Sequence, residues 1–416
     1  MRTVRLDEGI WRSDVPNGLV ILTERMPWLR SAAAGFWVKT ASAHEPREKM
    51  GVSHLLEHMV FKGTATRSAQ DIAVALESRG GGLDAYTGRD HTTYQARMLD
   101  ADFPLALDLL TDIVRRPLLR EADLALERNV VLEEIATVED TPDDLVFDLH
   151  AAALWGSHSY GYRILGTRET VADLTVEDLK ALHRRTYLPH QLVFAAAGNV
   201  EHEAVLGLLE RAGWFALEPG PQEQVVAAPA AATRLEQRVE RDGAQVHLVF
   251  GTETFRYGDP RRHALVLVST IFGSGMSSRL FQRVREELGL AYTVYAFHSF
   301  LQASGAAGVY VGTQPPTAEQ AAATIREEFA KLARHSLTAE ELASAKQQVK
   351  GQLVLALEGP VSRMYRLAGS ALYAESYKTI DQVLGEIDAV RPDEVAAVAA
   401  EFYAPERQVV VWLGPS

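Results

Sequence analysis

The chain of 416 residues contains no cysteine. This absence excludes disulfide bonds, thiolate metal ligands and a cysteine nucleophile. Any metal ion bound by side chains must therefore be held by histidine, aspartate or glutamate.

Long apolar segments are also missing. No run approaches the roughly 18 consecutive apolar residues that a membrane-spanning helix needs. The first residues, Met1 to Asp14, carry several charges and lack the apolar stretch of a secretory signal. We therefore expect no membrane partner, and a cytoplasmic enzyme is the simplest interpretation.

Basic residues are in deficit. The 42 Lys and Arg against 55 Asp and Glu give a net charge of −13, which opposes binding to nucleic acid. A hydrophobic fraction of 47% is ordinary for a folded globular protein. The length predicts two or more domains.

The two halves of the chain share a pattern at a constant offset. Tyr187-Leu188-Pro189 followed by Gly198 corresponds to Tyr403-Ala404-Pro405 followed by Gly414, with the same separation for each pair. We therefore predict a duplicated domain. The stretch 218–232, rich in proline and small residues, is the predicted linker between a domain at 1–217 and a repeat at 233–416.

Strand-like and helix-like segments mix within each half. Runs such as 32–38 and 307–311 have strand patterns, whereas 69–78 and 104–114 have helical patterns. Single helices do not regularly separate neighbouring strands. The fold class predicted is α+β, with helices packed on a mainly antiparallel sheet in each of two similar domains.

The segment 51–61 contains the pattern H-x-x-E-H, formed by His54, Glu57 and His58. No helix breaker interrupts it, and residues four apart share one helix face, so both imidazoles can converge on one metal ion. The pattern is the inverzincin signature, in which the glutamate is the general base. Zinc then needs a third protein ligand and an open position for water.

A second predicted helix, 121–139, offers carboxylates for that third position. Glu127 and Glu134 are two helical turns apart and share a face, whereas Glu133 points about 100° away from Glu134. Helical geometry by itself leaves all three as candidates.

The run HLLEHMVFKGT at 54–64 resembles the pitrilysin-like zinc metallopeptidases, which include insulin-degrading enzyme, the mitochondrial processing peptidase and small two-domain bacterial members. The resemblance covers essentially the whole chain. It implies one Zn²⁺ per chain and a third ligand at a fixed distance after the second histidine, which counted from His58 falls on Glu134. It also implies that Glu127 does not bind the metal itself but orients a ligating histidine.

The segment 80–94 resembles the G-G-x-x-N-A-x-T stretch of that family, whose edge strand pairs with the substrate backbone. Ala85 and Thr87 match, and Asp84 replaces the family's Asn. The resemblance implies substrate binding at Asp84 and Ala85. An aspartate lacks the donor of the amide, so we expect an altered contact there.

The second half lacks H-x-x-E-H, since 269–274 read STIFGS. It resembles the inactive repeat of the family, which supplies an arginine and a tyrosine seven positions apart, matched by Arg285 and Tyr292. We assign Arg285 to substrate anchoring and Tyr292 to stabilising the developing oxyanion. Without the family, 273–275 resembles a phosphate loop but lacks the following G-K-[ST].

The resemblance implies a zinc-dependent endopeptidase that cleaves peptides or unfolded segments inside a closed chamber. The chain matches half of a four-domain chamber, which predicts a homodimer, with a heterodimer containing a paralogous subunit as the competitor. Two other functions stay open, a non-catalytic scaffold or partner subunit and a metal amidase acting on non-peptide substrates. No G-x-S-x-G elbow supports a serine hydrolase.

Overall fold

The computed structural model describes residues 1–220, 225–230 and 234–415. The chain forms two compact units, each built from segments of both halves of the sequence. The first unit contains Met1–Ile135, Arg163–Val225 and Ala356–Tyr377, and the second contains Ala136–Tyr162, Val226–Leu355 and Lys378–Ser416. Among the described residues, no helix combines the length and the apolar character that crossing a membrane requires.

The first unit is built on a seven-stranded sheet of order β1-β2-β3-β7-β4-β6-β5. All described strand pairs in it are antiparallel except β3 with β7. Helices α1 and α3 cover one face and bury the main core of the unit. The strands are β1 (Arg2–Asp7), β2 (Ile10–Asp14), β3 (Val20–Arg25), β4 (Ser31–Val38), β5 (Gly82–Thr87), β6 (Thr92–Leu99) and β7 (Leu192–Gly198).

The helices of the first unit follow the same chain segments. They are α1 (Val52–Val60), α2 (Ala69–Glu77), α3 (Phe103–Arg115), α4 (Glu121–Asp140), α6 (Arg168–Asp173), α7 (Val176–Thr186), α8 (His202–Arg211) and α12 (Pro360–Leu372). Helix α4 continues into the second unit from Ala136 onward.

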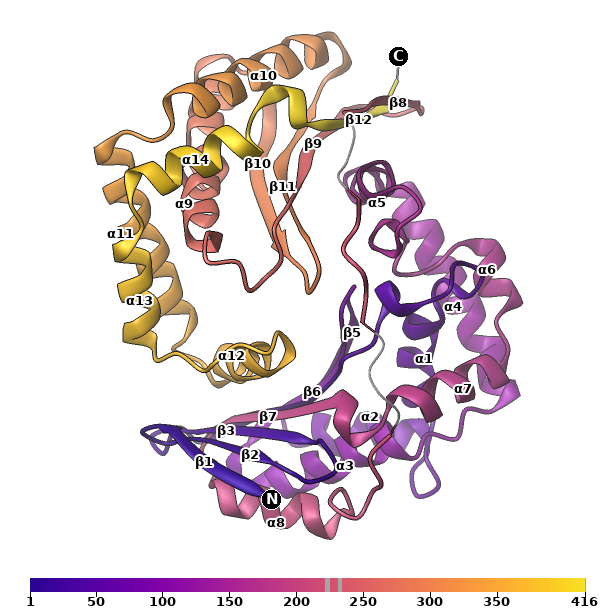
Figure 1. The fold of residues 1–416 in the computed structure, drawn as a ribbon. Helices are drawn as coiled ribbons and strands as arrows, with labels where there is room; N and C mark the ends of the chain where they lie inside the picture. The colour runs from indigo at the N-terminus through magenta and orange to yellow at the C-terminus, as the bar shows by residue number, and fades with distance from the viewer. Residues whose placement is uncertain (221–224, 231–233, 416) are drawn as a thin grey trace. The chain divides into compact units, whose positions relative to one another are not determined.

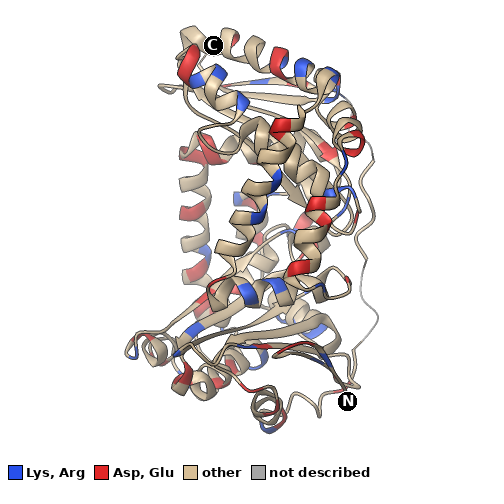
Figure 2. Cartoon of the chain, turned by 90° about the vertical axis from the view of Figure 1, so that its left-hand side faces the viewer, with Lys and Arg blue, Asp and Glu red and all other residues tan. Residues whose placement is uncertain are grey.

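The second unit has a five-stranded sheet of order β10-β11-β9-β12-β8, with β8 and β12 as its parallel pair. Its strands are β8 (Glu236–Glu240), β9 (Val246–Thr254), β10 (Ala291–Phe300), β11 (Gly305–Thr313) and β12 (Val409–Gly414). Its helices are α5 (Pro142–Trp155), α9 (Arg262–Gly273), α10 (Ala318–His335), α11 (Ala339–Ala356), α13 (Ile380–Ala389) and α14 (Pro392–Phe402). Figure 2 shows acidic and basic residues together on several helices of the chain.

The two units repeat one topology, which confirms the predicted α+β fold with a duplicated domain. The order β3-β7-β4-β6-β5 of the first sheet corresponds strand by strand to β8-β12-β9-β11-β10 of the second. Helices α7 and α14 are related by the offset read from the sequence, both at their first and at their last residues. The parallel pair occupies the same place in both sheets.

Two equivalent helices are exchanged between the halves. At the same offset, α5 of the first half corresponds to α12 of the second. Helix α5 packs on β9 and β12 of the second unit, and α12 packs on β3, β4 and β7 of the first unit (Figure 1). The prediction assigned 1–217 and 233–416 to separate domains, whereas each compact unit takes one helix from the other half. The predicted linker, 218–232, lies partly outside the described residues.

The packing of α12 on the sheet explains why β7 is apolar on both of its faces. This strand reads LVFAAAG and is buried throughout, as expected for a strand covered on both sides. The alanines give α12 a close approach, and Met364 and Leu367 are fully buried against the sheet beside Trp37. The Arg363 guanidinium also pairs with the buried Glu24 carboxylate of β3.

We expect Leu367→Ala to destabilise the first unit by about 2–5 kcal/mol, because a fully buried leucine leaves a cavity under the sheet. The matched control is Leu126→Ala on α4, whose side chain is 67% exposed, and surface changes of this kind stay within about 0.5 kcal/mol. Denaturant unfolding followed by tryptophan fluorescence measures both. Equal effects of the two substitutions would contradict the packing of α12 against the sheet of the first unit.

Candidate metal centre

Helix α1, which carries the H-x-x-E-H pattern, begins at a glycine that cannot cap it. Gly51 has φ +92°, and a Cβ there would lie 2.6 Å from the Leu165 carbonyl oxygen. The usual Ser, Asp or Asn cap is therefore sterically excluded. The cap comes instead from Glu45, whose two carboxylate oxygens accept from the backbone N–H groups of Gly51 and Ser53, each at 2.8 Å.

The Glu45 carboxyl is buried, and burial raises its pKa to about 7 against the opposing effect of the donors from Ser53 and Gly51. The unpaired N–H groups and the positive end of the helix dipole favour the ionised carboxylate, but burial outweighs them. Sequence reasoning did not single out Glu45. Its only local signal is an acidic residue nine positions before His54.

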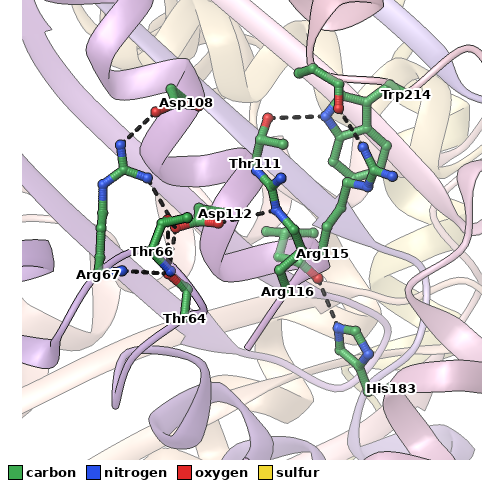
Figure 3. Close-up of polar contacts among 12 residues, drawn as sticks. Thr64, Thr66, Arg67, Asp108, Thr111, Asp112, Arg115, Arg116, His183 and Trp214 are labelled. Carbon is green, nitrogen blue, oxygen red and sulfur yellow. Dashed lines mark hydrogen bonds and ion pairs between the residues drawn. The ribbon is translucent and has the colours of Figure 1, made fainter. Parts of the chain in front are cut away.

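The other end of α1 is held by a buried carboxylate on α3. Asp112 Oδ2 accepts from the hydroxyls of Thr64 and Thr66 at 2.5 and 2.8 Å and from Arg67 Nη1 at 2.9 Å (Figure 3). Burial would raise the pKa of Asp112, but these three donors outweigh it and hold that pKa below its ordinary value. The loop after α1 is thereby fixed, which explains the Thr of the HLLEHMVFKGT run.

The three predicted ligands meet on the partly exposed face of α1. His54 Nε2 and His58 Nε2 each lie 3.6 Å from Glu134 Oε2, and one ligand atom from each residue lies within 4.8 Å of the others. Glu133, the neighbouring carboxylate on α4, is exposed. The structure thus brings Glu134, and not Glu133, to the histidines.

This arrangement fits a zinc ion. Tetrahedral zinc with bonds of 2.0–2.1 Å separates its ligand atoms by roughly 3.3 Å, close to the 3.6 Å observed. Burial, together with the neighbouring His58, lowers the pKa of His54 to about 3. The imidazole of His54 is therefore neutral at physiological pH, as a metal ligand must be.

Glu127 sets the orientation of His58. Its Oε2 lies 3.2 Å from His58 Nδ1, and its Oε1 pairs with Lys62 Nζ at 2.7 Å. An ionised carboxylate only accepts, so this contact places the imidazole proton on Nδ1 and directs the Nε2 lone pair toward Glu134. The contact with His58 agrees with the supporting role that the family resemblance implies for Glu127, and that role stays a prediction.

Glu57 lies on the same helix and faces the edge strand of the sheet. Its side chain is buried, and its Oε2 accepts a 2.6 Å hydrogen bond from the Thr87 hydroxyl at the end of β5. Burial raises the pKa of Glu57, although Thr87 and His58 act in the opposite direction. A carboxylate with a raised pKa is suited to accepting and returning a proton near neutral pH.

The predicted substrate residues on β5 project from different faces of the sheet. Ala85 packs against the core on the α1 side, as does Leu83. Successive side chains of a strand alternate between faces, so Asp84 and Tyr86 point to the α12 side. Asp84 Oδ2 accepts from Gln95 Nε2 at 3.1 Å.

Arg285 and Tyr292 belong to the second unit. The Arg285 guanidinium lies 4.2 Å from the centroid of the Tyr292 ring, and its Nη1 donates to the Tyr292 carbonyl oxygen at 3.2 Å. Tyr292 is 75% exposed, so its hydroxyl is available to a ligand. The structure pairs these two residues with each other, and their roles toward substrate stay predictions.

The second unit has no counterpart of the metal cluster at the equivalent positions. At the offset that relates the two halves, Thr270, Gly273 and Ser274 replace the histidines and the glutamate of the motif, and Lys350 replaces Glu134. A Cβ at Gly273 would lie 2.3 Å from the Ala296 backbone nitrogen, because β10 lies directly against α9 there. The space that the Glu57 side chain occupies in the first unit is therefore closed at the equivalent position of the second.

The duplicated fold and this cluster define the class of inverzincin-type metal proteins, in which H-x-x-E-H is completed by a distant glutamate. Residues 20–168 match the family described as insulinase, peptidase family M16, and residues 173–349 match the peptidase M16 inactive domain. The chain belongs to peptidase family M16, which confirms the pitrilysin-like resemblance seen in the sequence.

Curated relatives extend the likeness over nearly the whole chain. An uncharacterized zinc protease of Streptomyces coelicolor is 40% identical over 411 residues, covering 97% of this chain and 89% of that protein. The uncharacterized zinc protease YmxG of Bacillus subtilis is 38% identical over 408 residues, covering 98% of both chains.

Solved structures show the same fold. A structure described as a peptidase M16 inactive domain from Pseudomonas fluorescens has a TM-score of 0.90 at 22% identity, with 98% of both chains covered. A protease from Helicobacter pylori has a TM-score of 0.89 at 20% identity, covering 98% of this chain and 99% of that chain.

We expect Glu134→Gln to weaken zinc binding by more than the roughly 10- to 100-fold typical of losing a supporting residue behind the ligands, because it removes a ligand charge. Glu133→Gln is the matched control, being the same change one position away on an exposed side chain, and it should leave affinity unchanged. Competition with a fluorescent zinc chelator measures both. The reverse result would move the ligand to Glu133.

Glu45 gives a pH-dependent prediction. Its folded pKa of about 7 exceeds its ordinary value of 4.5, so its protonated form favours folding. That contribution is complete below about pH 4.5 and is lost as the pH rises through 7. Between these limits, metal-free wild-type protein should lose stability relative to Glu45→Gln by up to about 1.4 kcal/mol per pH unit.

Urea unfolding of metal-free protein at several pH values measures this difference. The control is Glu48→Gln, an exposed glutamate three positions away, whose stability should follow that of the wild type. Parallel curves for wild type and Glu45→Gln would show that Glu45 does not titrate as assigned.

Proposed function

We propose that the protein is a zinc-dependent endopeptidase that hydrolyses peptides and unfolded segments. The observation that carries this proposal is the meeting of His54, His58 and Glu134 beside the buried carboxylate of Glu57. One zinc ion per chain is part of the proposal, as is the cytoplasmic location expected from the sequence.

The three ligands would hold the metal, and a zinc ion bound there supplies a polarised carbonyl and a water of lowered pKa. Glu57 accepts the proton of the attacking water and passes it to the leaving amine. Thr87 keeps the Glu57 carboxylate in place through its 2.6 Å hydrogen bond. Since burial raises the pKa of Glu57, this carboxylate holds a proton more readily than an exposed one.

The sheet edge supports an extended substrate. Strand β5 is the terminal strand of its sheet, so its outer backbone groups are free to pair with a peptide. Its last residue, Thr87, contacts the proposed general base. A peptide added to this edge would therefore pass beside Glu57, and a folded protein would offer no free strand to pair.

Arg285 and Tyr292 are proposed to bind substrate and to stabilise the oxyanion. Because the second unit holds both residues and the first holds the metal ligands, we propose a homodimer in which these residues of one subunit serve the centre of the other. A heterodimer with a paralogous chain would satisfy the same requirement.

Hydrolysis of a quenched fluorescent peptide tests the function. Activity should disappear on chelation and return with zinc at about one metal ion per chain. Glu57→Gln should lower kcat by at least the roughly 10²- to 10⁴-fold expected on losing a general base, while its zinc content stays that of the wild type. Zinc binding without hydrolysis of the peptide would favour the scaffold alternative. Hydrolysis of a non-peptide amide with which an unrelated unfolded peptide fails to compete would favour the amidase alternative.

A further inference from the structure

A pocket of about 540 Å³ opens along the N-terminal end of the edge strand β5. We call it the β5 pocket. Its floor is β6, its outer wall is β5, and Val361 of α12 lines it from the opposite side. It lies wholly within the first unit and on the face of the sheet away from α1.

Cross-strand register determines which side chains reach the pocket. Asp84 is paired with Gln95, and Gly82 is paired with Arg97. These four residues share the α12 face, because the intervening Leu83 packs into the core on the other side. The charged residues lining the pocket are Asp84 and Arg97.

Both charges are open to a ligand. Asp84 and Arg97 are exposed, and the Asp84 carboxylate accepts one hydrogen bond, from Gln95. Among the described residues, no hydrogen-bond or ion-pair partner of the Arg97 guanidinium is found. Gly82 leaves the way to Arg97 clear, since a Cβ built on Gly82 would meet nothing within 4 Å.

Further along β5, beyond the residues that line the pocket, the strand reaches two aromatic rings. The Tyr86 ring stacks on Tyr365 of α12 with centroids 6.3 Å apart, and its hydroxyl lies 3.0 Å from His91 Nε2. The next residue along β5 is Thr87, which bonds Glu57. One strand therefore connects the proposed general base to the exposed charges of the pocket.

We propose that the β5 pocket is a charge-selective subsite for the extended peptide substrate. A basic side chain of the substrate binds Asp84. An acidic side chain two positions away on the substrate strand passes over Gly82 and binds Arg97. Alternate residues of a strand added to β5 face this side of the sheet, so the two selected residues are separated by one residue. The inference rests on the proposed peptidase function, whose substrate class it narrows.

The spacing along β5 locates the selected residues relative to cleavage. Asp84 precedes Thr87 by three positions, or roughly 10 Å at about 3.3 Å per residue. The basic residue therefore lies about three residues, and the acidic residue about five, from the bond cleaved beside Glu57. The direction of the substrate strand decides whether the peptide reads Lys-x-Glu or Glu-x-Lys.

The test compares three quenched peptides that differ only at those two positions, carrying Lys-x-Glu, Glu-x-Lys or two glutamines, with cleavage sites read by mass spectrometry. One charged order should exceed the glutamine peptide in kcat/KM by up to about 25-fold, since an exposed ion pair is worth up to about fivefold and two are formed. Equal rates for all three peptides would overturn the proposal.

Variants assign the preference to the pocket. The double charge reversal Asp84→Arg with Arg97→Glu should reverse the preferred order. Gly82→Val should abolish selection of the acidic residue alone, because it blocks the way to Arg97 without changing any charge. The matched control, Arg79→Gln, removes an exposed charge that does not line the pocket and should keep the wild-type ratio. A ratio that survives the double reversal would overturn the proposal.

Binding separates this inference from the proposed activity. The same peptides, labelled with a fluorophore, are titrated onto zinc-loaded Glu57→Gln protein and followed by anisotropy. The charged preference in affinity should match the wild-type rates and should fall in Arg97→Gln. Selective binding without cleavage by the wild type would refute the peptidase and retain the subsite, whereas cleavage or binding without selectivity would refute the subsite.

Discussion

The centre depends on a helix of nine residues that is held at both ends by buried carboxylates. Two imidazoles one turn apart can share a metal ion only if α1 neither frays nor turns about its axis. Glu45 supplies the missing cap where Gly51 cannot carry one, and Asp112 fixes the loop that follows through three donors. Both carboxylates are buried, so they remain engaged in conditions under which exposed ion pairs would be screened.

The exchange of α5 and α12 has a direct consequence for folding. The apolar strand β7 is covered on one side by helices of its own half and on the other by α12, which arrives from the far end of the chain. Neither half of the sequence can therefore bury its sheet alone. The duplication created two similar halves, and the exchange makes each depend on the other for a complete core.

The edge strand β5 combines two tasks that a terminal strand permits. Its outer backbone groups are free to pair with a peptide, and its side chains alternate between the core and the α12 face. Thr87 at one end touches the proposed general base, while Gly82 and Asp84 at the other end leave charged groups accessible. One segment of six residues thus connects the centre with the surface that a substrate would follow.

The sequence by itself determined what depends on local geometry and repetition. The i, i+4 spacing of His54 and His58 brings both imidazoles to one helix face, and the duplication was visible as short turn motifs recurring at one constant offset. Only the tertiary structure decided the rest. The meeting of Glu134 with α1, the orientation of Asp84 toward α12 and the exchange of α5 with α12 all join segments far apart in the chain. The cap by Glu45 spans only six to eight residues, but it depends on how the loop before α1 is folded and buried. Such contacts are fixed by packing and burial, for which no local pattern of residues is sufficient.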